Sequence, residues 1–131
     1  MSHDHSPGFL ALTSEARSRV KELAIAEFVK RLQAGEQFIV LDNREDHEWA
    51  AGHVPGAHHM SKGVIERDIE KAIPQKDAPI VLYCGGGFRS VLVADNLQKM
   101  GYTNVRSLAG GWRGWAEQGL PTAAGEAAVG A

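Results

Sequence analysis

The stretch from Ile80 to Ser90 constrains the fold of this chain more than any other feature of the sequence. Four consecutive apolar residues lead into Cys84, the only cysteine of the chain, and three glycines follow it. From residue 90 to residue 100 apolar side chains recur at helical spacing. We therefore expect a buried strand, a tight loop and a helix, in that order.

The loop of this stretch is suited to holding a reactive sulfur. Backbone N–H groups of a glycine-rich loop can converge on one point, and the N-terminus of the following helix adds partial positive charge. A single free cysteine is often just a small buried core residue, but a core position needs neither three glycines nor a nearby arginine. We interpret Cys84 as a nucleophile in an anion-binding cradle made by Gly85, Gly86, Gly87, Phe88, Arg89 and Ser90.

Short apolar runs alternate with helical patterns from about residue 38 to residue 118, which is typical of an α/β fold with a largely parallel sheet and helices on both faces. Asp42 and Arg44 follow the apolar run Phe38–Leu41, as Cys84 follows its own run. Because functional crevices of such sheets lie at the carboxyl ends of the strands, these groups should meet at one edge. We expect strands at residues 23–25, 38–41, 57–60, 80–83 and 104–108, and helices at 27–33, 45–51, 62–73, 90–100 and 112–118.

Length and charge exclude several classes of protein. The chain has 131 residues, which suits one domain, and 14 Lys and Arg against 16 Asp and Glu give a formal net charge of -2. A nucleic-acid-binding protein would usually carry a basic excess. No apolar run approaches the roughly 20 residues of a membrane helix, and the N-terminus lacks a signal-peptide pattern. A single cysteine fits a reducing compartment, so we expect a cytoplasmic protein.

Five motifs in this order resemble the signatures of rhodanese domains, over roughly residues 23–121. They are Leu41-Asp42-Asn43-Arg44-Glu45, Gly52-His53-Val54-Pro55-Gly56-Ala57, Val81-Leu82-Tyr83-Cys84, Gly101-Tyr102-x-Asn104-Val105 and Gly110-Gly111-Trp112-x-x-Trp115. The resemblance implies one domain with a central, largely parallel five-stranded sheet. Outside it we expect an N-terminal extension, residues 1–22, made of a tail and then a helix from about Thr13, and a disordered C-terminal tail, residues 122–131.

The resemblance implies a sulfurtransferase that forms a persulfide on Cys84. Cys84 would take the sulfane sulfur of a small anionic donor such as thiosulfate and pass it to cyanide or a thiol, without a cofactor. Arg89 would attract the anionic donor, and Asp42 and Arg44 would brace the loop region. Gly85 departs from the family, in which a basic or bulky polar residue often follows the cysteine. The loop should therefore be less cationic and more open, which leaves room for a larger donor such as glutathione persulfide.

Other interpretations are left open by the residues. A rhodanese-like domain can serve as a binding module without catalysis, and a cysteine phosphatase or arsenate reductase uses a Cys-x5-Arg loop, one residue longer than the spacing of Cys84 and Arg89. The histidines lack further ligands at suitable spacing, so we expect no metal site. The apolar patch Phe9–Leu12 would dock either on the domain itself or on a second subunit in a homodimer.

Overall fold

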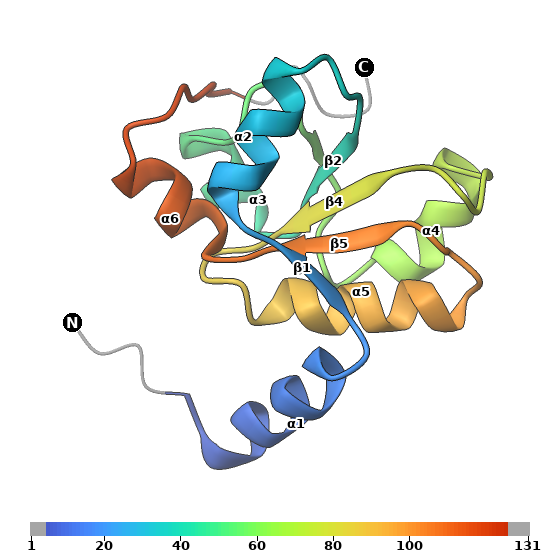
Figure 1. Cartoon of the computed structure of the whole chain (residues 1–131). Coiled ribbons are helices and arrows are strands. Elements are labelled where there is room, and N and C mark those ends of the chain that lie inside the picture. The colour runs from blue at the N-terminus through green and yellow to red at the C-terminus, as the bar shows by residue number, and fades with distance from the viewer. Residues whose placement is uncertain (1–4, 126–131) are drawn as a thin grey trace.

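The computed structural model describes residues 5–125 of the chain. Within them the chain forms six helices and five strands (Figure 1). In chain order these are α1 (Pro7–Arg17), β1 (Lys21–Leu23), α2 (Ile25–Gln33), β2 (Ile39–Asp42), α3 (Asp46–Ala51), β3 (His58–His59), α4 (Ile65–Ala72), β4 (Ile80–Tyr83), α5 (Arg89–Lys99), β5 (Val105–Leu108) and α6 (Gly111–Glu117).

The five strands form one sheet in the order β1-β5-β4-β2-β3, and every neighbouring pair is parallel. The expected α/β fold with a parallel sheet is confirmed. β4 is central, and its carboxyl end lies beside that of β2, with Tyr83 opposite Asp42. The sheet therefore brings the residues after β2 and after β4 to the same edge, as the alternation of strands and helices predicts.

Helices cover both faces of the sheet, and β4 contributes alternate residues to two separate cores (Figure 1). Ile80 and Leu82 pack with α4 and α5, whereas Val81 and Tyr83 pack with α2, α3 and α6. All four side chains are fully buried. This double burial explains why the strand is a continuous apolar run rather than an alternating one.

The N-terminal helix begins earlier than the sequence analysis predicts. α1 starts at Pro7, not near Thr13, and the Ser6 hydroxyl caps it by accepting the Phe9 N–H at 3.3 Å. Serine at the cap and proline at the first helical position are a strong start signal, which the weak apolar periodicity of residues 7–12 conceals. β1 begins at Lys21, so the expected extension 1–22 contains the start of an edge strand.

α1 is attached to the rest of the domain through α5 (Figure 1). The guanidinium of Arg19 forms two hydrogen bonds with the Asp95 carboxylate, Nε to Oδ1 at 3.0 Å and Nη2 to Oδ2 at 2.7 Å. The side-chain amide of Gln98 donates to the Arg19 carbonyl at 3.0 Å. Thr13 and Ala16 of α1 are buried. The helix is therefore part of the domain and not a loosely attached extension.

The expected disorder of residues 122–131 is wrong for their first part. Ala123 and His53 exchange two backbone hydrogen bonds of 2.8 and 2.9 Å, and the Gly125 N–H donates to the Ala50 carbonyl. Backbone pairing of this kind requires no side-chain pattern, so an Ala- and Gly-rich segment does not reveal it. Residues 126–131, like residues 1–4, lie outside the described residues. Across residues 5–125 no helix combines the length and apolar character needed to cross a membrane.

The attachment of α1 should depend on pH. The pKa of the Asp95 carboxyl lies below its ordinary value of 3.8, chiefly because Arg19 donates hydrogen bonds to the ionised form. The native state then binds fewer protons than the unfolded chain, so this contribution to stability is present above pH 3.8 and is lost as pH falls through the lowered pKa. We expect Asp95→Asn to lower the free energy of unfolding in urea at about pH 7 and to have a smaller effect at about pH 3. An equal effect at both pH values would contradict this role.

Candidate active site

Cys84 follows β4 directly, and its sulfur is surrounded by donors from the loop. Sγ accepts the backbone N–H of Gly87 at 3.2 Å and that of Ser90 at 3.4 Å. The side chain is only 1% exposed. Ser90 lies in the first turn of α5, so its N–H is one of the free donors at the start of that helix. Both donors are oriented to stabilise negative charge on the sulfur.

The Ser90 hydroxyl adds a third polar group to the sulfur. Its oxygen lies 3.5 Å from Cys84 Sγ and 2.8 Å from the Ser107 hydroxyl, and both serines are fully buried. Ser107 lies on β5 and was not identified from the sequence. Because Ser107 can satisfy the Ser90 oxygen, the Ser90 proton is free to point at the sulfur. The Ser90 hydroxyl therefore contacts the sulfur of Cys84.

The start of α6 holds the loop from its other side. The Cys84 carbonyl accepts the Trp112 N–H at 2.8 Å, and the Gly85 carbonyl accepts the Arg113 N–H at 2.9 Å. This approach requires Gly111, which has φ +54°, because a Cβ there would meet the Cys84 oxygen and lie 3.0 Å from the Gly85 oxygen. With these carbonyls directed to α6, the later N–H groups of the loop are left to face the sulfur.

Two arginines flank the loop. Arg89, two-thirds buried at the start of α5, has its guanidinium 4.0 Å from carboxylate oxygens of both Glu45 and Glu48. Arg113 lies against the loop backbone, where a Cβ on Gly86 would be 2.8 Å from its Nη1. Arg113 forms no ion pair within residues 5–125. The expectation of a less cationic loop is thus offset by a cation from α6 that the sequence analysis missed.

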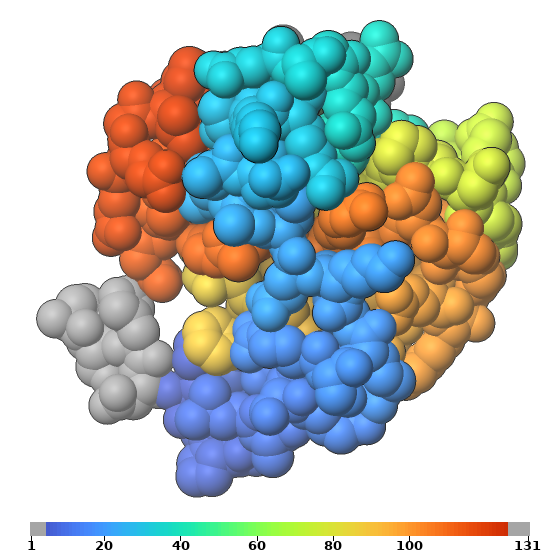
Figure 2. Space-filling model, in the orientation of Figure 1, coloured from blue at the N-terminus to red at the C-terminus, as the bar shows by residue number. Residues whose placement is uncertain are grey.

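A cavity of about 500 Å³ opens above Cys84. In Figure 2 the surface of the loop after β4, in yellow, lies between the blue α1 and the orange-red α6. Gly87 and Ser90 contact the sulfur through their N–H groups rather than lining this cavity. Neither α1 nor α3 was expected here. The lining residues are His5, Ser6, Phe9, Glu48, Cys84, Gly85, Gly86, Phe88, Arg89 and Arg113.

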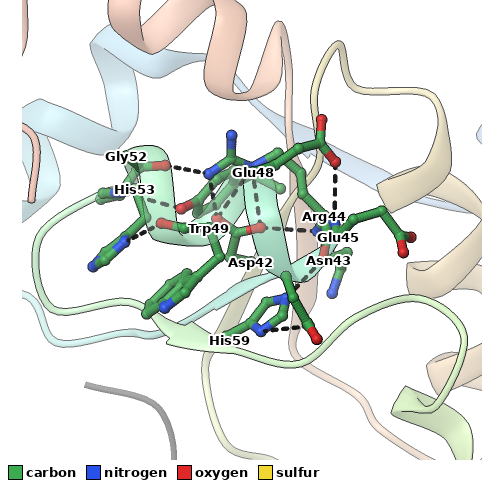
Figure 3. A network of polar contacts seen from close by, with 12 residues as sticks. Asp42, Asn43, Arg44, Glu45, Glu48, Trp49, Gly52, His53 and His59 are labelled. Atoms are coloured by element: carbon green, nitrogen blue, oxygen red, sulfur yellow. Dashed lines mark hydrogen bonds and ion pairs between the residues drawn. The ribbon is translucent and has the colours of Figure 1, made fainter. Parts of the chain in front are cut away.

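Asp42 and Arg44 form a buried ion pair beside the loop (Figure 3). Arg44 donates from Nε to Asp42 Oδ1 at 3.1 Å and from Nη2 to Oδ2 at 2.8 Å, and its Nη2 also donates to the Gly52 carbonyl. Burial lowers the pKa of Arg44, but the hydrogen bond and charge of Asp42 outweigh it, so the net shift is upward. The guanidinium lies 4.7 Å from the centre of the Trp112 ring. The pair therefore supports Trp112, whose N–H holds the Cys84 carbonyl.

Comparison with known proteins identifies the family of this site. The model of the rhodanese-like domain matches residues 25–118. The chain belongs to the rhodanese-like family. It is 35% identical over 107 residues to a sulfurtransferase of Allochromatium vinosum, covering 82% of this chain and 98% of that protein. It also matches YrkF of Bacillus subtilis with 28% identity, but spans only 55% of that protein's length.

Solved structures agree with this assignment. RPA3614 of Rhodopseudomonas palustris, a protein of unknown function described as a possible tyrosine phosphatase, superposes with a TM-score of 0.81 at 28% identity, over 94% of this chain and 99% of its own. The polysulfide-sulfur transferase of Wolinella succinogenes, a homodimer, superposes with a TM-score of 0.74 at 28% identity, over 89% and 88%.

Two histidines of this rhodanese-like domain, His53 and His59, make structural contacts away from the cavity. His53 stacks on Trp49 with ring centres 3.5 Å apart, and its Nδ1 lies 2.9 Å from the Trp49 carbonyl. His59 Nε2 lies 2.7 Å from the Arg44 carbonyl (Figure 3). Residues 5–125 contain no group of three or more His, Cys, Asp or Glu side chains arranged to hold a metal ion. These histidines thus support the Asp42–Arg44 region rather than the cavity.

The contact between α6 and the cysteine loop can be tested at two glycines of the domain. In Gly111→Ala the alanine must adopt a strained left-handed conformation, and its Cβ clashes with the Cys84 and Gly85 carbonyls. In Gly119→Ala the alanine has the same kind of backbone strain, at φ +67°, but its Cβ meets nothing within 4 Å. We expect the free energy of unfolding to fall by about 1 kcal/mol for Gly119→Ala and about 2–4 kcal/mol for Gly111→Ala. Urea titration measures both. Equal losses would mean that the close approach at Gly111 is unimportant.

Proposed function

We propose that this protein is a sulfurtransferase in which Cys84 carries the transferred sulfur as a persulfide. The observation that supports it best is the sulfur of Cys84, which accepts two backbone N–H groups beneath a cavity flanked by Arg89 and Arg113. Such a cradle stabilises an anionic sulfur both before and after transfer. Relatives that are named sulfurtransferases add support.

In the first half-reaction the Cys84 thiolate attacks the outer sulfur of the donor. With thiosulfate a bond forms between Sγ and the sulfane sulfur, the S–S bond of thiosulfate breaks, and its electron pair leaves with sulfite. The enzyme is left with an anionic persulfide, and no proton needs to move. The N–H groups of Gly87 and Ser90 and the Ser90 hydroxyl are positioned to share the negative charge.

In the second half-reaction a nucleophilic acceptor takes the outer sulfur. Cyanide would form thiocyanate, and a thiolate would leave as its persulfide; in each case the S–S bond breaks and Cys84 regains its thiolate. Neither half-reaction uses a cofactor. Arg113 and Arg89 would attract the anionic donor, and Asp42 and Arg44 would keep the loop in place through Trp112.

Glutathione persulfide is an alternative donor to thiosulfate in this proposal. A cavity of about 500 Å³ falls in the range of sites for small organic molecules, and Gly85 and Gly86 place no side chain across it.

A cytoplasmic location also remains a prediction. So does a homodimer, for which the exposed Leu10 and Leu12 of α1 provide apolar surface, 42% and 55% exposed.

Two other functions are less well supported. A phosphatase loop has five residues between cysteine and arginine, but only four separate Cys84 from Arg89. A loop that is one residue shorter has less backbone with which to surround a tetrahedral phosphate. It is better suited to a single sulfur atom. A binding module without catalysis would need neither the donors to Sγ nor the flanking arginines.

The intact mass of the protein after brief thiosulfate treatment tests the proposal directly. We expect a gain of one sulfur atom that cyanide removes, and no gain in Cys84→Ser, which keeps the volume and a hydroxyl acceptor in the cradle. If neither thiosulfate nor glutathione persulfide adds sulfur, the protein is not a sulfurtransferase. Hydrolysis of p-nitrophenyl phosphate by the wild type but not by Cys84→Ser would then favour the phosphatase.

Arg113 provides a second test, on donor binding. Arg113→Gln removes the cation beside Gly86, and we expect KM for thiosulfate to rise roughly three- to tenfold while kcat changes less, because this exposed side chain attracts the anion in ground and transition states alike. Arg67→Gln is the matched control, since Arg67 is exposed on α4 and paired with Asp68. A fall in kcat at unchanged KM would contradict the binding role.

A further inference from the structure

The N-terminal segment closes one side of the active-site cavity with aromatic rings. The ring of His5 lies 4.5 Å from that of Phe88 and 5.0 Å from that of Phe9, centre to centre, and Phe9 and Phe88 are 6.1 Å apart. All three residues line the cavity above Cys84. We call them the aromatic wall. Phe88 belongs to the cysteine loop, whereas His5 and Phe9 come from the start of the chain.

The aromatic wall is held in place by contacts of α1 with the loop. Arg17 donates from Nη2 to the Gly87 carbonyl at 3.2 Å, and its guanidinium lies 5.4 Å from the centre of the Phe88 ring. Glu22 pairs with Arg17 at 3.2 Å. Together with the Arg19–Asp95 pair, these contacts fix α1 against both α5 and the loop. Phe9 therefore has a defined position relative to the sulfur.

The cavity has two chemically different sides. Cys84, Arg89 and Arg113 suit the sulfur and the charge of an anionic donor, whereas the Phe9 and Phe88 rings offer neither a hydrogen bond nor a charge to a small, hydrated oxyanion. Phe9 and Phe88 are only half-buried, so each keeps apolar surface that faces the cavity. A ligand that covered this surface would gain from removing it from water.

We propose that the aromatic wall is a subsite for the organic group of an anionic sulfane-sulfur donor. The inference rests on the proposed sulfur transfer and names its substrate class: organic persulfides and thiosulfonates with an apolar or aromatic substituent, in preference to thiosulfate. The charge of the donor lies toward Arg89 and Arg113 while its substituent packs on Phe9 and Phe88. α1 is then a specificity element of the active site.

Thiosulfonates test this class because they differ from thiosulfate chiefly in one substituent. With benzenethiosulfonate the Cys84 thiolate bonds to the outer sulfur, the sulfur–sulfur bond breaks, and its electron pair leaves with benzenesulfinate. The enzyme is left with the same anionic persulfide as with thiosulfate. Methanethiosulfonate reacts in the same way and has a substituent too small to cover the wall.

The experiment compares kcat/KM for benzenethiosulfonate, methanethiosulfonate and thiosulfate, with cyanide as acceptor, in the wild type, Phe9→Ala and Leu10→Ala. We expect the ratio of benzenethiosulfonate to methanethiosulfonate to fall roughly tenfold in Phe9→Ala, because the phenyl group loses its apolar partner. Leu10, on the same helix, is exposed and outside the cavity, so Leu10→Ala should keep the wild-type ratio. An unchanged ratio in Phe9→Ala, including an equal loss with all three donors, would overturn the subsite.

Binding without chemistry keeps the proposal testable if Phe9→Ala fails to fold. In Cys84→Ser, calorimetric titration should give tighter binding of benzenesulfonate than of methanesulfonate by roughly tenfold. Equal affinities would overturn the subsite. If the wild type takes sulfur from none of the three donors and not from glutathione persulfide, the proposed function fails, while this titration still decides whether the wall binds an organic group.

Discussion

The position of the Cys84 sulfur depends on a close backbone contact between two loops at the carboxyl edge of the sheet. The carbonyls of Cys84 and Gly85 accept the N–H groups of Trp112 and Arg113, and Gly111 lets the two backbones approach. Because these carbonyls are satisfied from α6, the loop can turn its later N–H groups toward the sulfur. The same contact brings the Arg113 side chain beside the loop. The N–H donors around the sulfur and the Arg113 cation therefore both depend on this backbone contact.

Positive charge near the sulfur is used in two different ways. Arg44 is buried, paired with Asp42 and stacked on Trp112, and removing either partner would leave an uncompensated buried charge. Arg89 and Arg113 lie at the cavity, where their ion pairs are long or, within residues 5–125, absent. An incoming anion can reach these two arginines without disrupting a buried pair. Rigidity and ligand attraction are thus assigned to different arginines.

The parts of this molecule that could be predicted are those encoded in contiguous stretches. The apolar runs of β2 and β4 and the helical spacing of α5 gave elements within one or two residues of their observed bounds, and Cys84 with its glycines came from one such stretch. Arg113, Ser107 and Phe9 reach the site only through tertiary contacts, and nothing in the local sequence of Ser107 or Phe9 indicates the cavity. The Gly110-Gly111 turn before Arg113, after a strand end, was the one available signal.

α1 links selectivity to the positioning of the sulfur. Phe9 forms the aromatic wall, and Arg17, two turns later on the same helix, holds the carbonyl of Gly87, whose own N–H donates to Cys84 Sγ. Gly87 has φ +93°, a conformation that glycine adopts freely, so an external bond to its carbonyl helps to select one orientation of the loop. A displacement of α1 from α5 would remove Phe9 from the wall and release this carbonyl together. The choice of ligand at the aromatic wall and the position of the N–H donors around the sulfur therefore both depend on the docking of α1.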